Sequence, residues 1–186
     1  MVNIGCGLDT TYERVDNGAL RWYDLDMPDT LELRTKIIPG KERSKYLAGS
    51  VFETSWFDKV EVEDNVFFIA SGVFYYFEES KIRELFLKIA DRFPGSEIIF
   101  DASSPIGVRM ANRMVIKRGG MDESSFLKWG LRRSKRIEQW DSRLKVLEEY
   151  SYFRNLEKGN IRLLTKAKAL LWDILWLSYM VHLRFG

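Results

Sequence analysis

Residues 65–70 read Asn-Val-Phe-Phe-Ile-Ala, and residues 97–100 read Glu-Ile-Ile-Phe. Between these two apolar runs, residues 80–93 carry apolar side chains at the i, i+3, i+4, i+7, i+8 and i+11 positions of one helical face. Acidic residues begin that helix and basic residues end it, as the helix dipole favours. The three segments predict a strand–helix–strand unit, with residues 65–70 covered on both faces near the centre of a parallel sheet.

Shorter apolar runs on both sides of this unit predict further elements of the same sheet. We expect strands at residues 1–4, 20–25, 46–52, 145–153 and 180–185, and helices at residues 30–38, 107–117 and 161–177. Residues 122–140 are charged and aromatic, and we expect a helical excursion or a mobile cover there. Strands that alternate with helices predict an α/β fold with a doubly wound, mostly parallel sheet.

Composition narrows the class of protein. The 186 residues fit one domain, and 29 Lys and Arg against 27 Asp and Glu leave a charge of +2, which disfavours nucleic acid as a partner. Cys6 and His182 are the only residues of their kinds, so neither an internal disulfide nor a Cys/His zinc site is expected. The sequence shows no signal peptide and no apolar run of about 20 residues, so we expect a cytoplasmic protein without a membrane span.

A glycine turn follows the first strand. Gly5 and Gly7 permit a tight bend and a close approach of a ligand to the backbone, although Thr10 replaces the third glycine of a dinucleotide-binding fingerprint. Asp24 and Asp26 end the second strand, 19 and 21 residues beyond Gly5, close to the ~20-residue offset of a ribose-binding acid. Together these features predict a cofactor that contains adenosine.

Two more segments are expected at the same edge of the sheet. Residues 49–52, Gly-Ser-Val-Phe, end the predicted third strand and suit the edge and face of an adenine. Ser71 and Gly72 follow the fourth strand and are expected to line the cleft at the strand ends, where open α/β sheets bind ligands. Phe74, which comes next, is expected in the core.

Four motifs carry a family resemblance. They are Val-Asn-Ile-Gly-Cys-Gly-Leu-Asp-Thr at 2–10, Arg-Trp-Tyr-Asp-Leu-Asp-Met-Pro at 21–28, Ala-Gly-Ser-Val at 48–51 with Ser-Trp at 55–56, and Arg-Phe-Pro-Gly-Ser-Glu at 92–97. In this order they resemble the leucine carboxyl methyltransferase family of class I S-adenosylmethionine-dependent enzymes, which includes bacterial polyketide-type O-methyltransferases. The resemblance implies a seven-stranded Rossmann-like sheet in the order 3-2-1-4-5-7-6, with the last strand antiparallel.

The resemblance also implies roles for the residues of the site. The glycine turn would hold the methionine part of S-adenosylmethionine, Asp26 the ribose, the third-strand segment the adenine, and the fourth-strand segment the sulfonium side. With Asp24 from the spacing, the residues expected to bind the cofactor are Gly5, Cys6, Gly7, Asp24, Asp26, Ser50, Val51, Phe52, Ser71 and Gly72. The implied activity is O-methylation of a small-molecule carboxylate or hydroxyl. A carboxylate needs little acid–base help, whereas a phenol needs a base, for which Tyr75, Tyr76 and His182 are candidates and His182 is more simply structural.

The sequence departs from the family pattern at three places. Relatives carry a helical segment before the first strand, and because Met1 starts on the strand we expect a single domain, 1–186, that is N-terminally truncated. Thr11 and Ser71 stand where many relatives have an arginine and a glutamate.

Two alternatives stay open. The first is a nicotinamide-dependent oxidoreductase, and the second is a non-catalytic remnant of the fold that self-associates through partly uncovered tryptophans at positions 129, 140, 172 and 176. For the methyltransferase, the partners to test are a small-molecule methyl acceptor and a second copy of the chain in a homo-oligomer. The basic residues Arg132, Arg133, Lys135 and Arg136 are expected on a solvated helix face.

Overall fold

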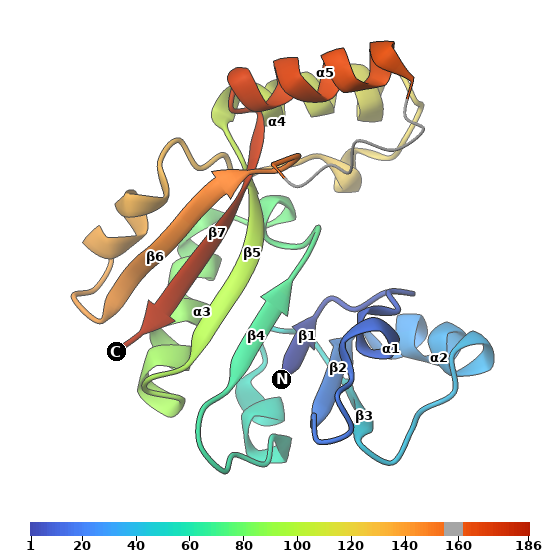
Figure 1. Cartoon of the computed structure of the whole chain (residues 1–186), viewed down its shortest axis with the longest axis vertical. Coiled ribbons are helices and arrows are strands. Elements are labelled where there is room, and N and C mark those ends of the chain that lie inside the picture. The colour runs from blue at the N-terminus through green and yellow to red at the C-terminus, as the bar shows by residue number, and fades with distance from the viewer. Residues whose placement is uncertain (155–161) are drawn as a thin grey trace.

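A computed structural model describes residues 1–154 and 162–186, without the side chains of residues 115–117 and 123 (Figure 1). Seven strands form one sheet in the order β3-β2-β1-β4-β5-β7-β6. The strands are β1 (Val2–Ile4), β2 (Trp22–Asp26), β3 (Ser44–Ala48), β4 (Phe67–Ala70), β5 (Glu97–Ser103), β6 (Leu144–Ser151) and β7 (Ser178–Phe185). The first five run parallel, and β7 is antiparallel to both β5 and β6. The predicted fold class, strand order and antiparallel last strand are confirmed.

In the described part of the chain, five α-helices connect or flank the strands. They are α1 (Thr11–Val15), α2 (Pro28–Ile37), α3 (Glu79–Arg92), α4 (Pro105–Ala111) and α5 (Leu163–Ile174). The strongest periodicity in the sequence forms α3, which buries its apolar stripe against the sheet and which agrees with the predicted range to within one residue at each end. Pro105 begins α4, and Ser104 Oγ accepts a hydrogen bond from Gly107 N–H, so this helix has a side-chain cap.

Several predicted boundaries are wrong. The third strand ends at Ala48, because Gly49 has φ +150° and its N–H bonds to Asp26 O at 2.9 Å, so residues 50–52 lie in a turn. The helix expected at 107–117 is α4 followed by a π-helical segment, Asn112–Lys117. Residues 122–140 contain only short 3₁₀ segments. The helix expected from residue 161 begins at Leu163, and Ile161 lies outside the described residues.

The core lies mainly on one face of the sheet. Phe68, Phe86 and Phe100 point to that face, and Phe86 contacts Phe100 and Phe185 edge to face at 5.7 and 5.6 Å between ring centroids. Phe74 is fully buried in the same cluster, as predicted. The alternate side chains of β4 are only partly buried. The prediction that this strand is covered on both faces is therefore wrong for the described part of the chain.

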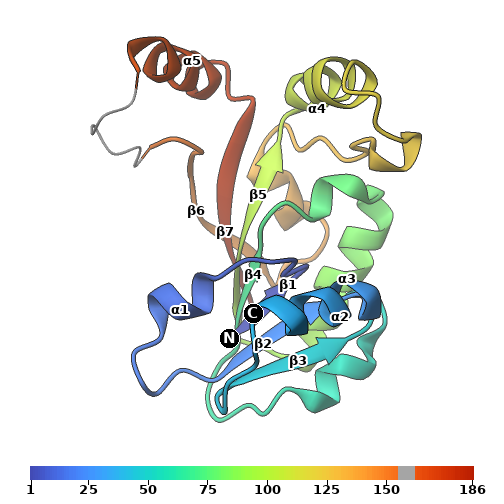
Figure 2. The same ribbon diagram turned by 90° about the vertical axis from the view of Figure 1, so that its right-hand side faces the viewer.

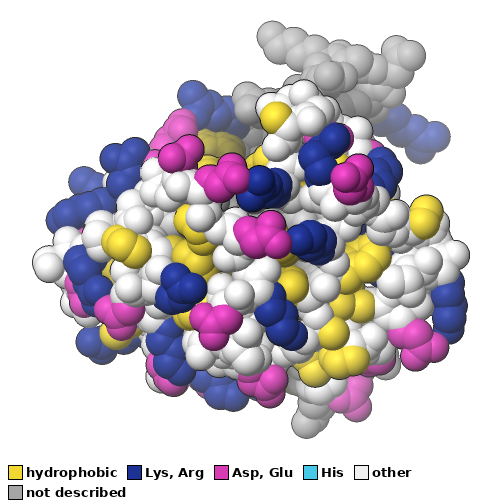
Figure 3. Space-filling model, turned by 90° about the horizontal axis from the view of Figure 1, so that it is seen from below, with side chains coloured by type: hydrophobic (Ala, Val, Ile, Leu, Met, Phe, Trp, Pro, Cys, Tyr) yellow, Lys and Arg dark blue, Asp and Glu magenta, His cyan; other side chains and the backbone are white. Residues whose placement is uncertain are grey.

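The two ends of the sheet differ. At the end toward which β4 and β5 point, α4 and α5 lie above the sheet, on opposite sides of β5 (Figure 2). The opposite end, seen in Figure 3, mixes Lys and Arg with Asp and Glu side chains and has apolar side chains between them. Within residues 1–154 and 162–186, no helix has both the length and the hydropathy of a membrane span.

Candidate functional site

The strand register brings the predicted site residues to one edge. Ile4 on β1 pairs with Leu25 and Ala70, and Ala70 pairs with Phe100. The next residue along each strand therefore stands in one row, in the order Asp26, Gly5, Ser71 and Asp101. The first three lie at the carboxyl ends of β2, β1 and β4, and Asp101 lies within β5, two residues before its end. Three inter-strand steps of about 4.8 Å make this row about 14 Å long, which suits one extended ligand.

Asp26 and the glycine loop are joined directly. Gly7 N–H donates to Asp26 Oδ2 at 2.7 Å, and Met27 N–H donates to Asp26 Oδ1 at 2.7 Å. Asp26 is half-buried, and each of its oxygens keeps a second lone pair for a ligand hydroxyl. The carboxylate therefore has a fixed orientation and free acceptor capacity at the open edge.

The backbone geometry at position 5 requires a glycine. Gly5 has φ +64°, its N–H bonds to Leu25 O at 2.8 Å, and a Cβ built on it would lie 2.6 Å from Val73 Cγ2. The absent side chain thus lets the backbone after β1 pass close to the segment after β4 while remaining exposed. This exposed backbone gives a cradle for the small, polar end of a ligand.

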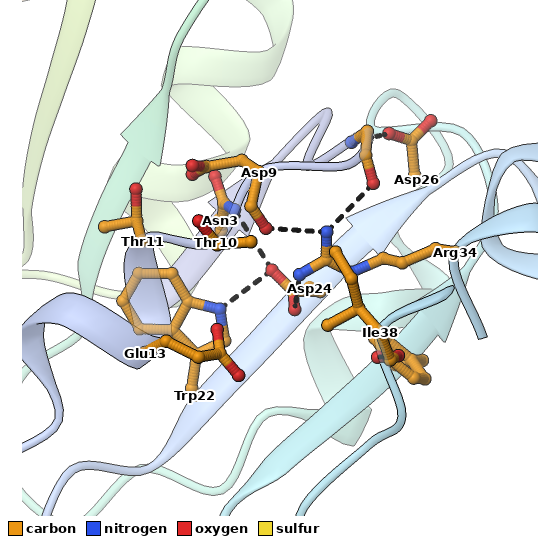
Figure 4. Close-up of polar contacts among 12 residues, drawn as sticks. Asn3, Asp9, Thr10, Thr11, Glu13, Trp22, Asp24, Asp26, Arg34 and Ile38 are labelled. Carbon is orange, nitrogen blue, oxygen red and sulfur yellow. Dashed lines mark hydrogen bonds and ion pairs between the residues drawn. The ribbon is translucent and has the colours of Figure 1, made fainter. Parts of the chain in front are cut away.

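Arg34 of α2 holds the glycine loop from below (Figure 4). Its Nη1 donates to Gly7 O at 3.0 Å and to Asp9 O at 2.7 Å, and its Nη2 donates to Asp24 Oδ2 at 2.8 Å. The side chain is 1% exposed. No sequence pattern indicated this residue, because an arginine on a short helix reads as a solvated position.

Asp24 belongs to this internal network. Its Oδ1 accepts hydrogen bonds from Asn3 Nδ2 at 3.0 Å and Trp22 Nε1 at 2.8 Å, and the residue is 1% exposed (Figure 4). Asp24 and Asp26 are two residues apart and share a face of the strand. They differ because Asp24 pairs with Asn3 inside the sheet, whereas Asp26 is the last residue of β2. We therefore correct the expectation for Asp24, which has a structural role and no access to a ribose.

Cys6 is also turned inward. Burial, with the nearby Asp24, raises the pKa of its thiol to about 12, so the side chain stays protonated and inert. Any contact of Cys6 with a ligand at this edge would come from its backbone.

The segment expected beside the adenine lies next to β2, after β3. Val51 is buried and its carbonyl accepts a hydrogen bond from Trp56 Nε1 at 3.1 Å, while Ser50 and Phe52 are half-buried. Phe52 packs edge to face on Phe77 with 4.8 Å between ring centroids. These contacts fix the turn and leave Ser50 and the Phe52 ring partly open at the site edge.

The fourth-strand end leads to an acid that the sequence analysis did not select. Ser71 is exposed, and Gly72 N–H donates to Asp101 Oδ1 at 2.7 Å. Asp101 is 6% exposed and forms no ion pair with any described residue. Burial raises its pKa above the ordinary value, and the Gly72 hydrogen bond offsets part of that rise. In the sequence, the signal that could have pointed to Asp101 was its position directly after the apolar run of residues 97–100.

A cavity of about 690 Å³ opens beside Asp101. It lies between the ends of β5 and β7 and the two helices above them, and its wall includes Tyr75, Tyr76, Asp101, Ser103, Gly107, Ala111, Met121, Ser124, Ser125, Leu127, Tyr152, Phe153, Trp172 and Ser178. Tyr75 contributes its hydroxyl close to Gly72, since a Cβ on that glycine would lie 3.3 Å from it. The cavity is therefore continuous with the end of β4.

The remaining candidates lie elsewhere. His182 Nε2 is 2.7 Å from Glu97 Oε2 on β5, outside the cavity wall, in a structural position. Trp129 is buried, whereas the tryptophans at 140, 172 and 176 are half-buried. The basic cluster at 132–136 surrounds a shallow, separate depression. No three His, Cys, Asp or Glu side chains of the described residues are grouped as metal ligands.

Comparisons with known proteins agree with this geometry. Residues 1–90 match the family described as leucine carboxyl methyltransferase. The tetracenomycin polyketide synthesis O-methyltransferase TcmP of Streptomyces glaucescens is 26% identical over 152 residues, which are 81% of this chain and 55% of TcmP. The chain thus spans about half the length of that curated relative.

Solved structures share the fold across the chain. A DUF574 family protein from Streptomyces avermitilis superposes with TM-score 0.69 at 12% identity, covering 100% of this chain and 74% of the other. The N-methyltransferase NodS of Bradyrhizobium japonicum, solved with S-adenosyl-L-homocysteine, gives TM-score 0.58 at 14% identity, covering 100% of this chain and 76% of NodS. The resemblance predicted from the four motifs is confirmed: residues 1–90 match the leucine carboxyl methyltransferase family model, and the sheet has the fold of the class I methyltransferase structures.

Proposed function

We propose that this chain is an S-adenosylmethionine-dependent O-methyltransferase that acts on a small molecule, and that its cofactor lies along the row from Asp26 to Asp101. The observation that carries the proposal is the bond between Gly7 N–H and Asp26 Oδ2 beside the exposed Gly5 backbone. The family match and the similarity to the O-methyltransferase TcmP support it.

The residues present fit the cofactor. The Asp26 carboxylate, an acceptor, suits the two ribose hydroxyls, and the Gly5 backbone has room where a Cβ would collide with Val73. Ser50 and Phe52 offer a hydroxyl and a ring to the adenine, and Ser71 with Gly72 lies toward the sulfonium. We propose these residues, with the Cys6 backbone and Val51 behind them, as the cofactor site.

Catalysis then depends on how the protein aligns the acceptor with the cofactor. When bound, S-adenosylmethionine supplies an electrophilic methyl group on a sulfonium. The protein has to place an acceptor oxygen in line with that methyl group and exclude water. The cavity beside Gly72 can hold the acceptor, since its wall of Tyr75 and Asp101 directly adjoins the end of β4.

Calorimetric titration with S-adenosyl-L-homocysteine tests the proposal. Wild-type protein should bind, and Asp26→Ala should weaken binding by about 10- to 100-fold, the worth of a hydrogen bond to a charged group. Asp29→Ala is the matched control, because Asp29 is an exposed acid at the start of α2, three residues away. Equal affinity of wild type and Asp26→Ala would refute the assigned ribose site.

NADH titration separates the alternatives. The oxidoreductase hypothesis predicts NADH binding that S-adenosyl-L-homocysteine does not displace, and the non-catalytic remnant predicts binding of neither. The family and fold matches favour the methyltransferase over both.

A further inference from the structure

The cavity beside Asp101 has an unusual charge pattern. Among its described wall residues, Asp101 is the one carboxylic acid, and no Lys, Arg or His contributes to the wall. A carboxylate acceptor needs a cation or several N–H donors in such a place, because burying an unpaired charge is costly. Beside Asp101, which is 6% exposed, it would also meet a second negative charge.

The rest of the wall suits a flat, neutral compound. Tyr75, Tyr76, Tyr152, Phe153 and Trp172 supply rings, and the serines supply hydroxyls. Tyr75 is itself a phenol whose pKa is raised above its ordinary value, by burial first and then by Asp101, so it remains a proton donor. Tyr75 is thus unsuited to accept a proton from a substrate at neutral pH.

Asp101 is positioned to accept a proton from a substrate. Its Oδ1 is fixed by Gly72 N–H at 2.7 Å, on the backbone that follows β4, and the carboxylate adjoins the cavity. The strand register puts Asp101 one inter-strand step from Ser71, which is the sulfonium end of the proposed cofactor row. An acceptor hydroxyl in the cavity can therefore lie against Asp101 on one side and the methyl donor on the other.

We propose that the cavity binds a neutral aromatic hydroxyl compound, in preference to a carboxylate, and that Asp101 takes the hydroxyl proton during methyl transfer. The acceptor O–H bond breaks to Asp101, the acceptor oxygen bonds to the methyl carbon, and the carbon–sulfur bond of the methylsulfonium breaks, with its electron pair left on a neutral thioether. This inference rests on the proposed methyltransferase function and selects the hydroxyl class from its two acceptor classes.

Binding of a matched pair of probes tests the acceptor class without turnover. With S-adenosyl-L-homocysteine present at pH 8, 2-naphthol should bind at least about tenfold more tightly than 2-naphthoate, a difference of about 1.4 kcal/mol. Asp101→Asn, which keeps the shape and an acceptor for Gly72 N–H, should bring the two affinities within about threefold of each other. Asp122→Asn, at an exposed acid outside the wall, should leave the preference unchanged.

Tighter binding of 2-naphthoate by the wild type would overturn the proposal, as would a preference that Asp101→Asn does not alter. These outcomes differ from failure of the methyltransferase function itself, which would show as no binding of S-adenosyl-L-homocysteine by the wild type.

The rate of methyl transfer tests the proton-accepting role. Asp101→Asn should lower the rate with 2-naphthol by about 10²- to 10⁴-fold while leaving the affinity for S-adenosyl-L-homocysteine within a small factor. A nitrophenol that is already ionised at pH 8 should restore much of the lost rate, because it has no proton to give. Equal losses with both phenols would show that Asp101 acts only through structure and would refute the proposed proton transfer.

Discussion

Two carboxylates are buried near the same edge of the sheet, and their surroundings are opposite. Asp24, beside the glycine loop, meets Arg34, Asn3 and Trp22, which together satisfy both of its oxygens. Asp101, beside the large cavity, receives one backbone hydrogen bond from Gly72 and no cation among the described residues. A fully paired buried acid stabilises the local structure only if its partners remain, whereas an unpaired one beside a cavity reduces stability and is available for chemistry.

The largest effect should come from removing the partner of the paired acid. Arg34→Ala leaves Asp24 charged and buried and also releases Gly7 O and Asp9 O, so we expect a loss of about 3–5 kcal/mol in the free energy of unfolding. Urea denaturation measures it. Lys36→Ala, at an exposed pair with Glu32 on the same helix, should change little. A small loss for Arg34→Ala would contradict the role given to this network.

A smaller effect is expected where the loop passes the segment after β4. Gly5→Ala combines a left-handed φ of +64° with a Cβ 2.6 Å from Val73 Cγ2, and we expect a loss of about 1–3 kcal/mol together with weaker binding of S-adenosyl-L-homocysteine. Gly7→Ala has a similar φ of +48° but open space around the new Cβ. The difference between the two variants in unfolding free energy isolates the close approach, and equal losses would refute it.

Neutralising the unpaired acid, Asp101, should raise stability, in contrast to the loss expected for Arg34→Ala. Because burial raises the pKa of Asp101 in the folded state, the folded chain binds more protons than the unfolded chain at intermediate pH, and stability falls as pH rises through that window. Asp101→Asn should therefore raise Tm at pH 8. Below the ordinary Asp pKa of 3.8 the gain should vanish. Thermal unfolding at both pH values measures this, and a variant less stable than wild type at pH 8 would contradict the account.

A third acid, half-buried and paired, should show the smallest effect. Arg184, and then His182, hold the pKa of Glu97 below its ordinary value of 4.5, so the pairs contribute stability above that pH and lose it as pH falls through the folded-state pKa. Glu97→Gln should cost at most about 1 kcal/mol at pH 7 and less at pH 3. A loss in unfolding free energy that is independent of pH would show that packing, and not charge, sets the contribution of Glu97.

The sequence predicted the fold well because its signals were local. The apolar stripe of α3 and the continuous run of β4 depend on neighbouring residues alone, and the family motifs supplied the strand order. The end of β3 was misplaced because residues 50–52 are as apolar as a strand, while the φ of Gly49 that ends it is a backbone property.

The site was predicted in part. Asp26, Gly5 and Ser71 stand in one row as the spacing indicated, but spacing did not separate Asp26 from Asp24, since the two differ in their partners: Asp24 is paired with Arg34 inside the fold, and Asp26 binds the glycine loop at the strand end. Arg34 and Asp101 were missed because their importance arises from contacts 27 and 29 residues away along the chain, with Gly7 and Gly72.

A crystal structure with S-adenosyl-L-homocysteine bound tests the central claim most directly. The account predicts ribose hydroxyls within hydrogen-bond distance of Asp26, the sulfur beside Ser71 and Gly72, and Asp24 still bonded to Arg34. A ribose bound away from Asp26, or a sulfur that points away from the cavity beside Asp101, would contradict it.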